Sequence, residues 1–374
     1  MESIPFIDLQ AQRRRLGSRI EEAIARVLER GDFILGKDVH ALEEELAALA
    51  GARHAITCGS GTEALQLPLM AWGIGPGDAV IVPAFTFVAT AEAVALVGAT
   101  PVFVDVDEVS FNLDPAALEG AVAHARSLGL RPRAIIPVDL YGQPADYPAI
   151  RACADRHGLL LLADGAQSFG ATLHGKPVGA LADVTATSFY PAKPLGCYGD
   201  GGAMFTDDDA LATLLRSLRV HGAGKAPYDN VRIGINGRMD TIQAAILREK
   251  LTIFPDELVA RQRVADAYNE GLAGAVIIPR LNAGATSAWA QYTIRTDKRD
   301  ALAAGLKEAG VPTAIHYPLP LSQQAGYRHY PSAPGGTAVS EQLAQTVLSL
   351  PMHPYLEAPV QQRIVDAVRK HASA

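Results

Sequence analysis

Cysteine and long apolar runs are both scarce in this chain of 374 residues. Its three cysteines, Cys58, Cys153 and Cys197, have neither the spacing of a disulfide framework nor that of a metal site. No apolar run approaches the ~20 residues of a membrane span. The first residues also lack the basic and apolar segments of a signal peptide. We therefore expect a cytoplasmic protein that keeps its thiols reduced and holds no metal.

Basic residues are also fewer than acidic ones. The chain has 33 basic and 40 acidic residues, and its net charge of -7 argues against a nucleic-acid-binding surface. With 49% hydrophobic and 20% charged residues, the composition is that of an ordinary globular protein. We expect neither a nucleic acid nor a membrane as a partner.

Short apolar segments alternate with helical segments from residue 52 to about residue 212. This rhythm is typical of an α/β fold, with a mostly parallel central sheet flanked by helices on both faces. The predicted strands are residues 54–58, 79–82, 102–106, 134–138 and 159–163.

Two domains are predicted. Residues 1–249 form a large domain, in which two helices precede the first strand: a first amphipathic helix with apolar positions from Leu16 to Leu28, and a second that carries Val39. Residues 250–374 form a smaller C-terminal α/β domain. Its predicted elements are strands at 290–295 and 312–316, a helix at 299–309 and a closing helix at 359–371.

Lysine is rare, and one lysine stands in an unusual setting. Only eight of the 33 basic residues are lysines, and Lys193 lies between Pro191 and Pro194, just before a run of glycines. Neither a helix nor a central strand accommodates that pattern, so the segment is a shaped loop. A lysine amine held by rigid neighbours can lose its proton and form a Schiff base with an aldehyde or ketone. Taken alone, an exposed loop lysine is the commoner case.

Two further motifs point to a ligand. Asp164 ends a buried apolar run, which aims its carboxylate at the crevice where open α/β sheets bind ligands, although an aspartate there can also cap the next helix. Residues 59–65, Gly-Ser-Gly-Thr-Glu-Ala-Leu, follow a short strand and open a helix. Free N–H groups and hydroxyls at such a helix start form an anion site.

Four features follow one another along the chain in an order that resembles a fold-type I pyridoxal phosphate (PLP) enzyme. They are the anion loop, an aromatic segment at 83–90, the strand-end aspartate and a serine five residues before the constrained lysine. Residues 58–65, 164–170 (Asp-Gly-Ala-Gln-Ser-Phe-Gly), the loop around Lys193 and residues 234–245 resemble the DegT/StrS family of nucleotide-sugar aminotransferases. The resemblance covers nearly the whole chain. It implies the fold of a PLP-dependent aminotransferase.

This resemblance assigns roles around the cofactor ring. Lys193 carries PLP and later moves the proton, and Asp164 keeps the pyridine nitrogen protonated. Gln167 lies near the phenolic oxygen of the cofactor, and Phe87 stacks on the ring face. Family members that dehydrate their substrate have a histidine in place of this lysine, so Lys193 argues against that branch.

The resemblance also implies a phosphate site shared between two subunits. Gly61, Thr62, the backbone N–H of Glu63 and the Ser188 hydroxyl hold the phosphate. Asn236 matches a family position that reaches the phosphate from the other subunit. The implied assembly is a homodimer with shared active sites.

The implied reaction uses L-glutamate as amino donor and a nucleotide-linked keto sugar as acceptor, with pyridoxamine phosphate as the intermediate form of the cofactor. The sequence is most similar to family members that aminate C3 of UDP-2-acetamido-2-deoxy-3-keto-glucuronic acid for surface polysaccharides such as lipopolysaccharide O-antigen. Arg238 then pairs with the uronate carboxylate. His316 and Tyr317 face the sugar.

Other functions stay open at this stage. A related enzyme acting at C3 or C4 of a dTDP-linked keto sugar fits the same motifs. Residues 59–64 also match the G-x-G-x-x-A fingerprint of an NAD-dependent dehydrogenase, but the acidic residue that this fingerprint needs after the next strand is missing. A non-catalytic protein on the PLP fold is a further alternative.

Overall fold

A seven-stranded, mostly parallel sheet forms the centre of the computed structural model, which describes residues 4–226 and 228–372. The strands lie in the order β1-β9-β8-β5-β4-β2-β3, and only β9 runs antiparallel to its neighbours. The predicted fold class is therefore confirmed. The strand bounds are β1 (His54–Cys58), β2 (Asp78–Pro83), β3 (Thr100–Val104), β4 (Arg131–Ile135), β5 (Leu160–Asp164), β8 (Val184–Ser188) and β9 (Gly202–Thr206).

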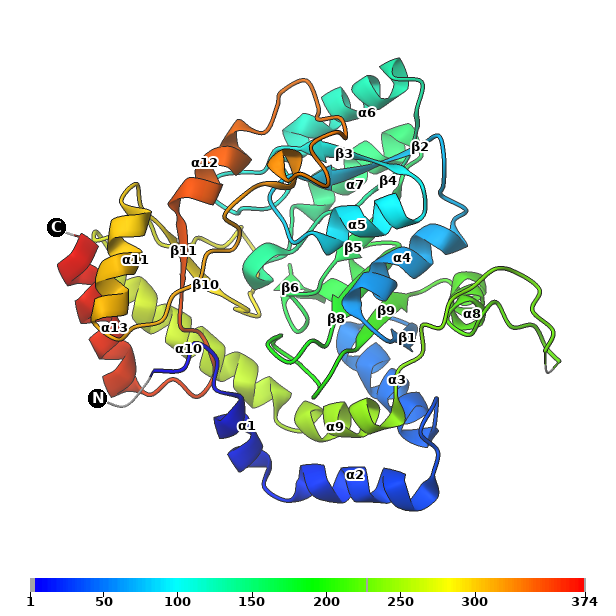
Figure 1. Ribbon diagram of the computed structural model, residues 1–374, viewed down its shortest axis with the longest axis horizontal. Helices are drawn as coiled ribbons and strands as arrows, with labels where there is room; N and C mark the ends of the chain where they lie inside the picture. The colour runs from blue at the N-terminus through cyan, green and yellow to red at the C-terminus, as the bar shows by residue number, and fades with distance from the viewer. Residues whose placement is uncertain (1–3, 227, 373–374) are drawn as a thin grey trace.

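Helices cover both faces of this sheet (Figure 1). Along β2, Val80 and Val82 pack in one apolar cluster with α4, α5 and α8, whereas Ala79 and Ile81 pack in a second cluster with α6 and α7. Both sets are fully buried because successive side chains of a strand point to opposite faces. These helices are α4 (Gly61–Ala71), α5 (Ala89–Leu96), α6 (Leu118–Ser127), α7 (Tyr147–His157) and α8 (Asp209–Leu218).

The N-terminal region differs from the prediction. The single helix expected there is two helices, α1 (Leu9–Leu16) and α2 (Arg19–Arg30), because Gly17 ends the first with φ of 60°. The next helix, α3 (Lys37–Ala50), matches the second predicted helix. Helix α9 (Thr241–Leu251) packs against both α2 and α3.

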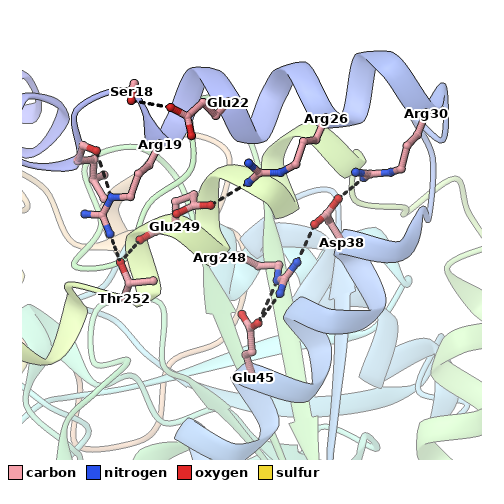
Figure 2. A network of polar contacts seen from close by, with 11 residues as sticks. Ser18, Arg19, Glu22, Arg26, Arg30, Asp38, Glu45, Arg248, Glu249 and Thr252 are labelled. Atoms are coloured by element: carbon pink, nitrogen blue, oxygen red, sulfur yellow. Dashed lines mark hydrogen bonds and ion pairs between the residues drawn. The ribbon is translucent and has the colours of Figure 1, made fainter.

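Ion pairs fasten α9 to these two helices, as Figure 2 shows. The Arg248 guanidinium donates to Asp38 at 2.7 Å and to Glu45 at 2.8 Å, and both acceptors lie on α3. Arg26 of α2 donates to Glu249 at 3.1 Å. Helix α9 is thus held on its outer side by charged contacts from two directions.

A second, smaller sheet lies in the C-terminal part. Strand β10 (Tyr292–Arg295) pairs antiparallel with β11 (Val347–Leu350). The strand predicted at 312–316 is wrong, since only Ala314 makes a bridge, to Ser349, and Pro312 has no N–H to extend the ladder. The surrounding helices are α10 (Phe254–Leu272), α11 (Arg299–Glu308), α12 (Ala338–Thr346) and α13 (Ala358–Ala372).

The division between the two predicted domains, after residue 249, falls inside α9 and stays a prediction. Ile4, close to the N-terminus, packs in the apolar cluster of α10, α11 and α13. Among the helices in the described part of the chain, none has both the length and the apolar character needed to cross a membrane.

Candidate active site

Two of the predicted site residues stand at the carboxyl ends of neighbouring parallel strands. Asp164 is the last residue of β5, and Ser188 is the last residue of β8. The two strands pair with Asp164 opposite Ala186. The two side chains therefore lie at the same edge of the sheet, where open α/β folds place their ligands.

Asp164 is a buried carboxylate with two donors. Its side chain accepts a hydrogen bond from the Thr90 hydroxyl at 2.8 Å and one from the Ala166 N–H at 3.2 Å. Burial raises the pKa of Asp164, while these two donors and the charge of Lys193 act in the opposite direction. A carboxylate in this setting attracts a proton or a cationic partner.

Lys193 lies within reach of that charge. Burial lowers the pKa of the Lys193 ammonium, and the Asp164 carboxylate offsets part of this effect. The loop that carries it turns tightly, since the Lys193 N–H donates to the Tyr190 carbonyl at 2.9 Å and the Cys197 N–H donates to the Phe189 carbonyl at 2.8 Å. The sequence prediction of a shaped loop is what the structure shows.

Gln167 links the sheet edge to the segment at 316–317. Its side-chain oxygen accepts from the Tyr141 N–H at 2.5 Å, and its amide nitrogen lies 3.4 Å from the Tyr317 hydroxyl. Burial and the nearby Asp164 charge both raise the pKa of Tyr317. The Tyr317 ring centroid is 6.1 Å from that of Phe87, which is 53% exposed.

His316 also belongs to this group of residues. Burial lowers the pKa of the His316 ring, and the Lys193 ammonium lowers it further. The ring nitrogen Nδ1 lies 2.9 Å from the Ser349 hydroxyl, and the Tyr141 hydroxyl donates to the His316 carbonyl. The structure thus brings five predicted residues together, namely Asp164, Lys193, Gln167, His316 and Tyr317.

The predicted phosphate loop starts helix α4 in a capped form. The Ser60 hydroxyl accepts from the Glu63 N–H at 3.2 Å, and the Glu63 carboxylate accepts from the Gly59 N–H at 2.7 Å. This reciprocal pair already uses the Glu63 N–H, which the sequence had assigned to the phosphate. The N–H groups of Gly61 and Thr62, at the first two helical positions, have no acceptor inside the helix.

Gly61 lets this helix start approach Ser188. A Cβ atom at Gly61 would lie 2.7 Å from the Cβ of Ser188 and 3.0 Å from its hydroxyl oxygen. Glycine is therefore required for the two segments to sit at this separation. The result is a small cradle that combines a helix N-terminus with a serine hydroxyl.

Asn236 and Arg238 lie next to each other on the segment that leads into α9. The Arg238 Nε donates to the Asn236 side-chain oxygen at 2.9 Å. The Arg238 carbonyl lies 3.3 Å from the position of a Cβ atom on Gly59. The same segment therefore passes beside the phosphate loop. Residues 224–226 and 228–233, between α8 and this point, are exposed and extend away from the rest of the molecule (Figure 1).

Sequence reasoning missed three polar residues near the site. The first two are Thr90, which donates to Asp164, and Tyr141, whose N–H donates to Gln167 and whose hydroxyl donates to the His316 carbonyl. Asp139 is fully buried and accepts from the Ser168 hydroxyl at 2.6 Å, the Ala145 N–H at 2.9 Å and the Tyr147 hydroxyl at 2.9 Å. Burial raises the pKa of Asp139 to about 7. Its N–H donates to the Asp164 carbonyl at 3.0 Å.

These residues fit PLP. The cofactor needs an amine for its aldehyde, an anion for its ring nitrogen, and a helix start with hydroxyls for its phosphate. Lys193 and Asp164 supply the first two, and their charges interact with each other. For the phosphate, Gly61 at the start of α4 and the Ser188 hydroxyl form a cradle, which a Cβ atom on residue 61 would fill.

Comparison with known proteins agrees with this fit. Residues 14–369 match the model of the DegT/DnrJ/EryC1/StrS aminotransferase family. The chain is similar to the UDP-2-acetamido-2-deoxy-3-oxo-D-glucuronate aminotransferase of Pseudomonas aeruginosa, with 50% identity over 95% of this chain and 96% of that protein. It is also similar to the dTDP-3-amino-3,4,6-trideoxy-alpha-D-glucose transaminase of Streptomyces venezuelae, with 42% identity over 99% of this chain and 96% of that one.

A solved structure shows the same arrangement of elements. The crystal structure of a DegT DnrJ EryC1 StrS aminotransferase from Brucella abortus superposes with a TM-score of 0.97 and 55% identity, covering 98% of this chain and 99% of that one. The predicted family, enzyme class and cofactor are thereby confirmed. The chain belongs to the DegT/DnrJ/EryC1/StrS aminotransferase family and is a PLP-dependent sugar aminotransferase.

Proposed function

We propose that this enzyme transfers the amino group of L-glutamate to C3 of a UDP-linked 3-keto uronic acid, with Lys193 as the lysine that carries PLP. The observation that carries the site assignment is the meeting of the partly buried Lys193 with the buried carboxylate of Asp164 at the end of β5. When bound, PLP supplies an electron sink for the carbon that exchanges its amine. The protein supplies the charges and donors around it.

Asp164 holds a proton on the ring nitrogen of the cofactor. A buried carboxylate beside a cation favours the charged pair, and the Thr90 hydroxyl keeps the carboxylate oriented. Lys193 accepts and returns the proton at the reacting carbon, and its lowered pKa favours the neutral amine that this role needs. Phe87 covers one face of the ring, and Gln167 lies near its phenolic oxygen.

The phosphate is held at the cradle of Gly61 and Ser188. The N–H groups of Gly61 and Thr62 and the Ser188 hydroxyl donate to it at the positive end of α4. The Glu63 N–H contributes only if it leaves the Ser60 hydroxyl. Asn236 of a second copy completes the phosphate site, so the working unit is a homodimer.

The substrate follows from the relatives and from charge. The Pseudomonas aeruginosa relative is named for a 3-oxo-glucuronate, which bears a carboxylate. Arg238 presents a guanidinium that pairs with a carboxylate through two parallel hydrogen bonds. His316 and Tyr317 contact the sugar beside it. The product then serves surface polysaccharide synthesis, such as that of O-antigen, in the cytoplasm.

A second candidate is a dTDP-linked keto sugar without the carboxylate. The Streptomyces venezuelae relative, named as a dTDP-sugar transaminase, favours it. The two candidates differ in the charge on the sugar. They can therefore be separated through Arg238.

Lys193→Ala tests the central assignment. The variant should lose turnover and lose the covalent link to PLP that borohydride reduction traps in the wild-type enzyme. Mass spectrometry of a tryptic digest should place the label on the peptide with Lys193. Retained transamination, or a label on another lysine, would overturn the assignment.

A further inference from the structure

Lys250 is a fully buried lysine, and it contacts the loop that carries Lys193. Its side chain is fully buried in α9, an uncommon place for an ammonium group. The Nζ atom donates to the Gly196 carbonyl at 2.6 Å, and it lies 4.1 Å from the centroid of the Tyr198 ring. Gly196 and Tyr198 follow Lys193 by three and five residues.

Gly196 has little freedom to move. A Cβ atom there would lie 2.6 Å from the Tyr190 carbonyl, and the Tyr190 carbonyl itself accepts the Lys193 N–H at 2.9 Å. The two sides of the turn are therefore in contact. Gly196 and the backbone N–H of Lys193 therefore meet at the same carbonyl, that of Tyr190.

A second side chain of α9 holds the same loop. The Gln243 side-chain oxygen accepts from the Tyr198 N–H at 2.9 Å. Gln243 and Lys250 are seven residues apart, which is close to two helical turns, so they project from the same side of α9. Other side chains of α9 bind the outer helices: Arg248 pairs with α3, and Glu249 pairs with α2 (Figure 2).

We propose that Lys250 is a positioning residue, whose buried ammonium binds the Gly196 carbonyl and thereby sets the place of Lys193 relative to Asp164. A charged donor to a carbonyl is stronger than a neutral one, and the Tyr198 ring stabilises the same charge. Helix α9 then serves as a fixed support between the outer helices and the cofactor loop. This proposal rests on Lys193 as the cofactor lysine, which Lys193→Ala tests separately.

Lys250→Met keeps most of the side-chain volume and removes the donor. We expect the dissociation constant of PLP added to the apoenzyme to rise about tenfold, equivalent to ~1.4 kcal/mol. We also expect the pH midpoint of the visible absorbance of the bound cofactor to move by about 0.5 units or more. That absorbance reports the surroundings of Lys193, and a general loss of stability would not change its pH midpoint.

Val264→Ala is the matched control. Val264 is buried in α10 in a different apolar cluster, so the variant loses stability without touching the loop. It should bind PLP with unchanged affinity and keep the wild-type pH midpoint. If Lys250→Met does not fold, Tyr198→Leu removes the ring beneath the ammonium and should shift the same two values in the same direction.

The proposal is overturned if Lys250→Met keeps both the wild-type affinity and the wild-type midpoint. It is also overturned if Val264→Ala moves the midpoint as far for the same loss of thermal stability. If Lys250→Met does not fold, the proposal is overturned when Tyr198→Leu keeps the wild-type PLP affinity and the wild-type pH midpoint. A failure of Lys193→Ala to lose its link to PLP would instead overturn the assignment of the cofactor lysine.

Discussion

Replacing Asp164 by asparagine removes the charge at the centre of the site and keeps its shape. The asparagine oxygen can still accept the Ala166 N–H, which donates to Asp164 at 3.2 Å. The neutral amide, however, no longer holds a proton on the ring nitrogen of the cofactor. We therefore expect a loss of turnover with little change in the fold.

The size of the loss follows from burial. Asp164 is only 6% exposed, so removing it leaves a buried cation without its partner, at a cost of about 3–5 kcal/mol. At about 1.4 kcal/mol per factor of ten, kcat/KM for the amino donor should fall roughly 150- to 4,000-fold.

Thr90→Val is a graded companion to this change. It removes one hydrogen bond to a charged group, worth about 1.5–3 kcal/mol, so the loss should be roughly 10- to 150-fold. Without the Thr90 hydroxyl the pKa of Asp164 rises further, so the loss should be larger at low pH and recover as pH rises. Thr90→Ser keeps the donor and serves as the control.

The assay is stopped-flow absorbance of the bound cofactor after mixing with L-glutamate, over a range of about pH 6 to 9. The reasoning fails if Asp164→Asn reacts nearly as fast as the wild-type enzyme. It also fails if Thr90→Val is slower than Asp164→Asn, because a supporting residue cannot matter more than the charge it supports.

Three further predictions concern the phosphate cradle, a second carboxylate and the substrate. Gly61→Ala places a methyl group 2.7 Å from the Ser188 Cβ and should weaken PLP binding by about 1–3 kcal/mol in a cofactor titration; unchanged affinity would contradict the cradle. Burial raises the pKa of Asp139 to about 7, so this carboxyl binds a proton on folding and lowers stability as pH rises from about 4 to about 7. The difference in Tm between Asp139→Asn and the wild-type enzyme should therefore shift in favour of the variant as pH rises across this range. A difference in Tm that does not change with pH would refute the raised pKa. Arg238→Ala should raise KM for a uronate far more than for a neutral 3-keto sugar; equal changes would remove the carboxylate role.

Five of the seven strands of the sheet were predictable from their buried apolar runs, whereas β8 (Val184–Ser188) and β9 (Gly202–Thr206) were not predicted. Residues 54–58 form β1 with the predicted bounds, and β5 is shifted by one residue from the predicted 159–163. Runs of this kind are near-continuously apolar and leave little choice of element. The loop around Lys193 was equally clear, since two prolines and several glycines exclude regular structure.

Contacts between distant segments were beyond sequence reasoning. Thr90 and Asp164 are 74 residues apart, and Lys250 is 54 residues from the Gly196 carbonyl that it binds. Neither pair has a local signal, because only the packing of α5 and α9 brings the partners together. The break at Gly17 was missed for another reason: the apolar pattern continues across it, so that α1 and α2 were read as a single helix.

The most direct test of the proposed function is a single-turnover absorbance trace. The purified enzyme is first treated with L-glutamate, which should bleach the visible band of the bound cofactor, and is then given the UDP-linked 3-keto uronic acid. Prompt return of the band would support the cofactor, the donor and the acceptor together. A band that stays bleached until a dTDP-linked or neutral keto sugar is added would contradict the proposed substrate.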